Sequence, residues 1–178
     1  MKNIIFVFIG LVILTVAALS FLKTGNSDNY NEQFLRIHIR ANSNTQEDQD
    51  LKYKVKEKLV DFLTPYLCAC DTKQKAVNEI NGLLDEIKKI ASDEIKQDGY
   101  NYDVRASIKH EEFPARSYEG FVLDAGFYDA LIVEIGSGTG DNWWCVVYPP
   151  LCFVNYDGTA QGVQYRSKLI EIIENFGK

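Results

Sequence analysis

Residues 141–153 read Asp-Asn-Trp-Trp-Cys-Val-Val-Tyr-Pro-Pro-Leu-Cys-Phe, and this stretch carries both tryptophans of the chain, two of its four cysteines and an adjacent proline pair. Large aromatic side chains contribute most to cores and interfaces, so two adjacent tryptophans mark a structural or binding centre. Because neighbouring side chains of a strand point to opposite faces, we expect one tryptophan to enter the core. The other, beside a glycine-rich loop, is either a contact point for a partner or a residue packed beneath another element.

The glycine-rich loop, Gly136-Ser137-Gly138-Thr139-Gly140, directly precedes this stretch and follows the nearly continuous apolar run Tyr128–Ile135. Such a run is typical of a central strand that is buried on both faces. The glycine spacing is GxGxG rather than GxGxxG, and the residues that follow have no helical periodicity to supply a helix N-terminus. We therefore expect a hairpin loop between two strands and no nucleotide site.

The first part of the chain predicts a strand followed by a helix. Residues 34–40 alternate apolar and polar side chains, which indicates a strand with one face in water. The polar residues of this strand are Arg36, His38 and Arg40. Residues 46–63 carry an apolar stripe at helical spacing, and Pro65 is expected to end this helix. Four lysines of the helix are interpreted as a solvated face: Lys52, Lys54, Lys56 and Lys58.

The remaining elements complete a fold class. A second helix is predicted from about Asp71 to Asp98, with Gly99 suited to a left-handed cap. Further strands are expected over residues 102–109 and 119–123, then a turn at Asn155–Gly158 and a short helix from Ser167. This order predicts an α+β fold, a mixed β-sheet with the helices packed on one face.

The N-terminus has the layout of an export signal. Lys2 precedes an apolar run from Ile4 to Leu22, about the length of a ~20-residue membrane span, and the run contains the small residues of Ala17–Ser20. The predicted organisation is a signal peptide or membrane anchor over 1–23, a linker over 24–33 and a single α+β domain over 34–178. The domain is therefore expected outside the cytoplasm.

The charge balance excludes some classes of partner. The chain carries 19 basic and 25 acidic side chains, a formal net charge of −6. Binding of nucleic acid needs a basic footprint, and so does docking on an anionic lipid surface. We expect no nucleic-acid partner, and membrane contact only through the N-terminal segment.

Residues that could carry catalysis or hold a metal are few. The two histidines, His38 and His110, have no second ligand at metal-site spacing, so we expect neither a metal nor another cofactor. His38 is interpreted as a solvated or hydrogen-bonded residue. The sequence contains no convincing catalytic set. A histidine with Cys145 or Ser137 as nucleophile stays open, and would make the protein an extracytoplasmic hydrolase.

A disulfide between Cys145 and Cys152 depends on the prolines between them. In an extended chain their Cα atoms would lie roughly 23 Å apart, whereas a disulfide needs about 4.4–6.8 Å. The bond therefore requires a tight turn at Pro149-Pro150, and export would make it chemically feasible. The alternative is that both cysteines are small buried apolar residues.

Two blocks of sequence resemble one protein family. The first is His38-Ile39-Arg40-Ala41-Asn42-Ser43, followed by Glu47-Asp48-Gln49 and Leu51-Lys52, and the second is residues 142–153. In this order they resemble the stage II sporulation protein R family, and the resemblance extends from about Phe34 to Phe153. The chain departs from the family pattern at Arg40, where an apolar residue is expected.

The resemblance implies a signalling role without catalysis. Members of the family are made in the forespore and exported into the space between the two sporulating compartments. There they activate a membrane-embedded aspartic protease, which cleaves the precursor of the mother-cell sigma factor E. The implied partner is that protease, and the implied location is the intermembrane space, with the protein either secreted or anchored by its N-terminal segment.

A partner surface is predicted from two segments at strand ends, because loops held by a rigid scaffold concentrate binding residues. One segment is the turn formed by Asn42, Ser43 and Asn44. The other contributes Gly138, Gly140, Asp141, Asn142, Trp143, Trp144, Pro149 and Pro150. The alternative is structural, with Asn42 capping a helix and the tryptophans filling the core.

Overall fold

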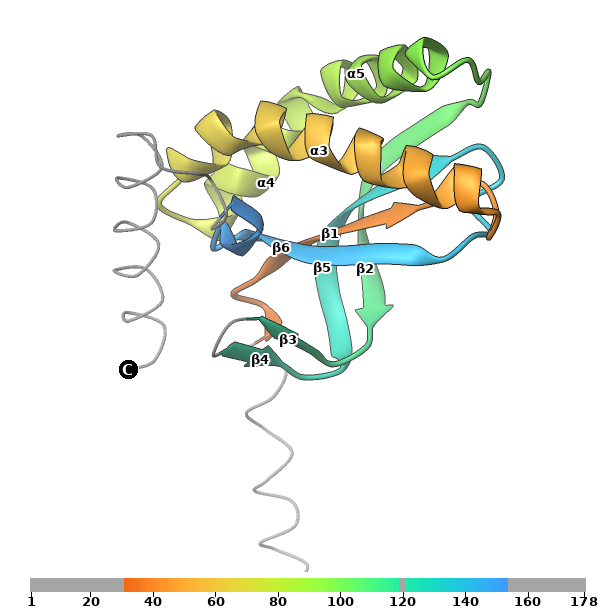
Figure 1. Ribbon diagram of the computed structural model, residues 1–178. Helices are drawn as coiled ribbons and strands as arrows, with labels where there is room; N and C mark the ends of the chain where they lie inside the picture. The colour runs from red at the N-terminus through yellow and green to blue at the C-terminus, as the bar shows by residue number, and fades with distance from the viewer. Residues whose placement is uncertain (1–30, 119–120, 154–178) are drawn as a thin grey trace, which may run out of the picture.

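The computed structural model describes residues 31–118 and 121–153, which form an α+β fold with a mixed sheet and helices (Figure 1). In chain order the elements are β1 (Leu35–Arg40), α3 (Gln46–Cys68), α4 (Lys73–Gly82), α5 (Leu84–Gln97), β2 (Val104–Phe113), β3 (Arg116–Tyr118), β4 (Phe121–Leu123), β5 (Gly126–Ile135), β6 (Asn142–Tyr148) and the 3₁₀ helix η1 (Leu151–Phe153). The predicted fold class is confirmed for this part of the chain.

The main sheet has the strand order β2-β5-β1-β6. β1 runs parallel to β5, whereas the β1–β6 and β2–β5 pairs are antiparallel, so the sheet is mixed. β5 lies between β2 and β1, as its continuous apolar run predicts. β3 and β4 form a separate two-stranded sheet, which lies on the side of the main sheet opposite the helices (Figure 1).

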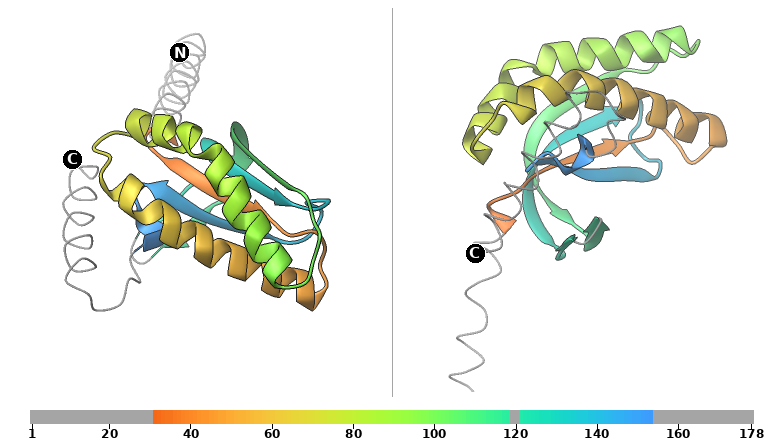
Figure 2. Two further views of the ribbon diagram at one scale, coloured as in Figure 1. Left: turned by 90° about the horizontal axis from the view of Figure 1, so that it is seen from above. Right: turned by 60° about the vertical axis from the view of Figure 1, so that its left-hand side comes forward.

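The three α-helices of the described residues cover one face of the main sheet (Figure 2). α3 and α5 pack on it through buried apolar stripes: Leu51, Val55, Leu59 and Leu63 of α3, and Ile87, Ala91 and Ile95 of α5. On the sheet these stripes share a core with Leu35, Ile37 and Ile39 of β1. The predicted packing of helices on one face is confirmed, and the burial of apolar surface holds the two layers together.

One predicted helix end is wrong, and one predicted helix is divided in two. α3 continues past Pro65 through its last turn, because that turn still buries Leu67. The proline removes one helical hydrogen bond, and the buried side chains of the turn outweigh that loss. The predicted second helix is divided into α4 and α5 at Leu83, directly after Gly82, whose helix propensity is low. Gly99 has a φ of 86°, the left-handed conformation expected of it.

The prediction that one face of β1 is in water is wrong. Arg36 is 0% exposed and His38 is 6% exposed. The face on which they lie carries a second, smaller apolar cluster, to which β2, β4, β5 and β6 contribute. Its buried members are Phe34, Phe113, Leu123, Tyr128, Ala130, Ile132 and Val146. β1 is therefore covered on both sides, by helices on one and by strand residues on the other.

Several predictions concern segments outside the described residues, namely the signal segment 1–23, the turn at Asn155–Gly158 and the helix from Ser167. Of the linker predicted over 24–33, the structure describes residues 31–33. There Asn31 is buried and accepts a hydrogen bond from the Tyr128 hydroxyl at 2.8 Å. Within residues 31–118 and 121–153, no helix combines the length and the hydropathy needed to cross a bilayer.

Candidate functional site

Asn42 joins three parts of the chain beyond the end of β1. Its Oδ1 atom accepts a hydrogen bond from the Ser137 backbone N–H at 3.0 Å, and its Nδ2 atom donates to Asp48 at 2.8 Å. Its backbone carbonyl accepts hydrogen bonds from the hydroxyls of Ser137 and Thr139. One asparagine therefore ties the glycine-rich loop to the first turn of α3.

Asp48 is the buried acceptor of this turn. It accepts hydrogen bonds from Asn42 and from the Ser43 hydroxyl, while its own N–H donates to the Thr45 hydroxyl at 3.3 Å. Burial alone would raise the pKa of Asp48, but hydrogen bonds from Ser43, Asn42 and Tyr102 bring it below its usual value. The N-cap of α3 is Thr45, so Asn42 fixes the helix start through Asp48 and does not cap it.

Gly140 brings the loop against the turn. Its N–H donates to the Ala41 carbonyl at 2.9 Å, and a Cβ atom at this position would overlap the Ser43 carbonyl oxygen. Next along the chain, the Asp141 N–H donates to the side chain of Asn44. The two segments predicted as a partner surface therefore meet in space, through backbone groups and short polar side chains.

Lys52 adds a contact that the sequence interpretation missed. It is 1% exposed, and its Nζ atom donates to Gln49 at 2.6 Å and to the Asp141 carbonyl at 3.1 Å. Burial lowers the pKa of Lys52, and the nearby charge of Asp141 opposes that shift. The interpretation of the lysines as a solvated face holds for Lys54 and Lys58, which are exposed, and is wrong for Lys52.

The two tryptophans lie on opposite faces of β6, as predicted for a strand. Trp143 packs against the helix-side core, with Lys56 Nζ 5.9 Å from its ring centroid. Trp144 packs on the other face, with the Arg116 guanidinium 4.4 Å and the His38 ring 5.4 Å from its centroid. Both tryptophans are half-buried, so neither one projects freely into solvent.

A charged network runs from β1 across the sheet. Arg40 donates to Glu111 and to Glu134, each at 2.9 Å, and His38 contacts Glu111 at 3.3 Å. Burial alone would raise the pKa of Glu134, but Arg105 and its other basic neighbours bring it below the usual value. Burial lowers the pKa of His38 despite its contact with Glu111. Arg40, where the resemblance led us to expect an apolar residue, is therefore paired with two acidic residues.

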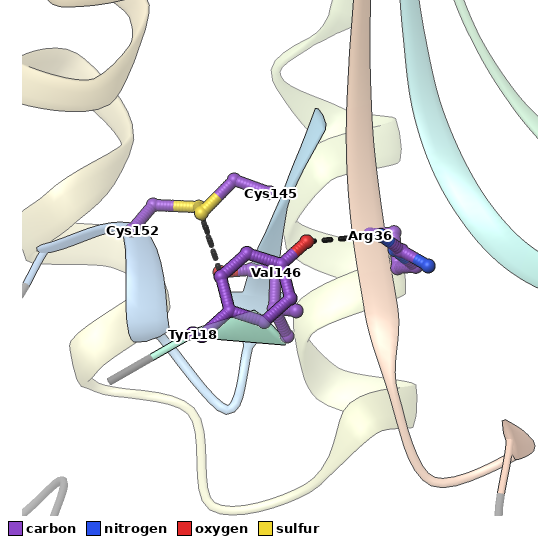
Figure 3. The surroundings of a disulfide bond; sticks show 5 residues. All are labelled: Arg36, Tyr118, Cys145, Val146 and Cys152. Carbon is purple, nitrogen blue, oxygen red and sulfur yellow. Dashed lines mark hydrogen bonds between the residues drawn. A yellow bond between two sulfur atoms is a disulfide. The ribbon is translucent and has the colours of Figure 1, made fainter. Parts of the chain in front are cut away.

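Pro149 and Pro150 are buried at the other end of β6, apart from the Asn42 turn. The chain reverses there, so that the Cα atoms of Cys145 and Cys152 lie 5.9 Å apart and their side chains form a disulfide (Figure 3). The Val146 carbonyl oxygen lies 2.8 Å from the sulfur of Cys152. The residues predicted to bind a partner therefore occupy two separate places along β6.

The nucleophile pairs considered from sequence do not assemble in the described residues. Cys145 belongs to the helix-side core, whereas His38 packs on the opposite face of the sheet. The Ser137 hydroxyl donates to a backbone carbonyl, and His110 contacts Asp129 at 2.9 Å. Across residues 31–118 and 121–153, no three His, Cys, Asp or Glu side chains are placed to hold a metal ion.

These observations define an α+β protein with a mixed sheet. At one end of that sheet, the turn held by the hydrogen bonds of Asn42 lies beside the start of β6, which carries the two tryptophans. The family model for stage II sporulation protein R matches residues 31–158, and the chain therefore belongs to this family. Stage II sporulation protein R of Bacillus subtilis (strain 168) is 34% identical over 125 residues, which cover 70% of this chain. The chain spans 56% of the length of that relative. No solved structure matches the chain.

Family membership confirms the resemblance read from the sequence. Sequence reasoning nevertheless missed Lys52, Glu111 and Arg116 as residues of this region. A signal for Glu111 was present at Arg40, because a charged side chain on a strand that is covered on both sides needs an acidic partner. Neither Lys52 nor Arg116 could have been recognised from the sequence, because each lies in a segment where exposed charged side chains are common.

Proposed function

We propose that this protein is an exported signalling protein of sporulation, which activates a membrane-embedded aspartic protease and so leads to cleavage of the sigma factor E precursor. The observation that carries this proposal is membership of the stage II sporulation protein R family over residues 31–158. On this proposal the forespore makes the protein and exports it into the intermembrane space, secreted or N-terminally anchored. The protein itself contributes no catalytic group.

The region around the start of β6 supports a binding role. Tryptophan and arginine are enriched among the residues that dominate binding energy, and Trp143, Trp144 and Arg116 lie there half-buried or exposed. The hydrogen bonds of Asn42 hold the adjacent turn and loop in one conformation. A surface that is ordered before the partner arrives loses less conformational entropy on binding.

Activation is tested by producing the full chain with the candidate protease and the sigma factor E precursor in a host that lacks sporulation proteins. We expect cleavage of the precursor only when all three are present, and none when a catalytic aspartate of the protease is replaced. Cleavage that proceeds without this protein would overturn the proposal. So would intact precursor in cells that export the protein and insert the protease.

Export is tested separately, because it depends on the N-terminal segment alone. A fusion of residues 1–30 to a reporter enzyme that is active only outside the cytoplasm should give activity. Deletion of Ile4–Leu22 should abolish that activity. A fusion that accumulates only in the cytoplasm would contradict the proposed location.

The hydrolase alternative makes a different prediction from the activator. An activator should still trigger precursor cleavage when both His38 and His110 are replaced by Gln, provided that the variant remains folded. A hydrolase that uses Cys145 or Ser137 with a histidine should lose its turnover. The placement of Cys145 and His38 on opposite faces of the sheet favours the activator.

A further inference from the structure

Two arginines on the face opposite the helices have no acidic partner among residues 31–118 and 121–153. Arg36 of β1 is fully buried and Arg116 of β3 is exposed, and none of the ion pairs between described residues includes either one. Arg36 donates to the Tyr118 hydroxyl at 2.9 Å. Its Nε and Nη1 atoms have no hydrogen-bond partner within residues 31–118 and 121–153. A buried cation is therefore left without a neutralising anion in this part of the chain, an arrangement that costs on the order of several kcal/mol.

Neighbouring aromatic rings offset only part of that cost. The Arg36 guanidinium lies 4.3 Å from the Phe113 ring centroid and 4.9 Å from that of Tyr128. Such cation–π contacts stabilise the charge without neutralising it. Burial is the main cause that lowers the pKa of Arg36, and the positive charge of Arg116 adds to the shift. A carboxylate brought to this face would interact favourably with both arginines.

Arg116 also stands on a partly exposed apolar surface. It lies over the ring of Trp144, and Trp144, Tyr118 and Leu151 are the partly buried residues that pack around the smaller core. The acidic residue on this side of the sheet next to His38 is Glu111, and it is already paired with Arg40. Protein–protein interfaces place surfaces of opposite electrostatic potential against each other. Aromatic and arginine side chains contribute most of the binding energy of such interfaces. The chemistry of the face therefore fits an acidic partner.

We propose that the face formed by Arg116, Trp144 and Tyr118, with Arg36 beneath it, binds a carboxylate-bearing segment of a protein partner. Arg116 pairs with the carboxylate, and Trp144 packs against the apolar neighbours of the acidic residue. A second copy of this chain is the poorer occupant, because pairing two such faces would bring Arg116 of one copy towards Arg116 of the other, and the like charges would repel. The identity of the partner as the protease rests on the proposed function, whereas the recognition of a carboxylate does not.

The binding test uses the full-length protein and two labelled peptides of equal length, measured by fluorescence anisotropy. In one peptide glutamate alternates with leucine, and in the other glutamine replaces every glutamate. We expect only the acidic peptide to bind, with an affinity that falls as salt is raised. Arg116→Glu should weaken binding by about tenfold or more. Lys89→Glu makes the same charge change at an exposed position of α5 and should alter affinity by less than about twofold.

Four results would overturn the proposal. Equal binding of the glutamine peptide would show that the face does not recognise carboxylates, and equal losses in Arg116→Glu and Lys89→Glu would show only a general charge effect. If truncation after residue 158 raises the affinity for the acidic peptide by about tenfold or more, the face binds the chain's own C-terminal segment. A dimer that Arg116→Glu dissociates in sedimentation would assign it to a second copy.

The activation assay separates this inference from the proposed function. If the wild-type protein triggers precursor cleavage and Arg116→Glu, with unchanged melting temperature, triggers it equally, the face is not the partner site and the proposed function stands. If the wild-type protein triggers no cleavage but binds the acidic peptide, the proposed function fails and the carboxylate site stands. We expect Arg116→Glu to lose cleavage and Lys89→Glu to retain it.

Discussion

The two faces of β1 are both buried, yet they differ in chemistry. The side chains in the helix-side core are Leu35, Ile37 and Ile39. Those that alternate with them and lie on the other face are Arg36, His38 and Arg40, among aromatic rings and carboxylates. Apolar burial stabilises the fold roughly in proportion to area, whereas the free energy that a buried charge gains from its partners about equals the cost of removing it from water. We therefore assign most of the stability to the helix-side face and recognition to the other.

The largest expected effect tests the helix-side face. Leu59 of α3 is fully buried in the core between α3 and the sheet. Leu59→Ala should lower the free energy of unfolding by about 2–5 kcal/mol, because it removes apolar contacts and leaves a cavity. Denaturant unfolding measures this, with the adjacent exposed Lys58→Ala expected to stay within about 0.5 kcal/mol of wild type. A loss below about 1 kcal/mol for Leu59→Ala would contradict the assignment.

The disulfide provides a second test of how much the helix-side face contributes to stability, because Cys145 and Cys152 pack with the helix-side core. In the chain-entropy account, closing a loop with a sequence separation of 7 contributes about 2.5 kcal/mol. Reductant should lower the free energy of unfolding by about that amount, and a variant with serine at both positions should be insensitive to reductant. Peptide mapping without reduction checks the bond itself. Free thiols at both positions would contradict it.

The helix-side half of the fold could be predicted from sequence because it follows from periodicity. The stripe of α3 and the continuous apolar run of β5 each indicate what they pack against. The end of α3 could not be predicted in the same way. Pro65 is a local stop signal, and only the tertiary burial of Leu67 explains why the helix continues.

The opposite face could not be predicted, because alternating polar residues normally mark a strand face in water. Tyr118, which covers Arg36, comes 82 residues later in the chain. For the candidate site, the sequence indicated the Asn42 turn and the loop around Gly140 as strand-end segments. Their meeting depends on the parallel β1–β5 and antiparallel β1–β6 pairings, which are long-range features that local patterns do not specify.

A smaller effect is expected from pH, on the charged face. Burial lowers the pKa of His38, so the unfolded chain, with an ordinary histidine pKa of about 6.5, takes up a proton before the folded chain does. The free energy of unfolding should therefore fall as pH decreases below about 6.5 and towards the folded pKa. Above that window the contribution is constant, because the histidine is neutral in both states.

The measurement compares unfolding of wild type and His38→Gln between about pH 7.5 and pH 5. The variant should lose less stability over this range. If His38→Gln and wild type lose the same free energy of unfolding, the buried histidine does not control the pH response.

The smallest effect is expected at Arg36, although it is among the largest fully buried side chains. Its two cation–π contacts are worth up to about 2 kcal/mol each when desolvated, and its charged hydrogen bond to Tyr118 about 1.5–3 kcal/mol. Removing the charge from water costs several kcal/mol, about as much as these contacts return. Arg36→Met, which keeps an unbranched chain between the rings, should change the free energy of unfolding by less than about 1 kcal/mol. A loss as large as that of Leu59→Ala would show that the charged face stabilises the fold as the apolar face does, and would remove the distinction between them.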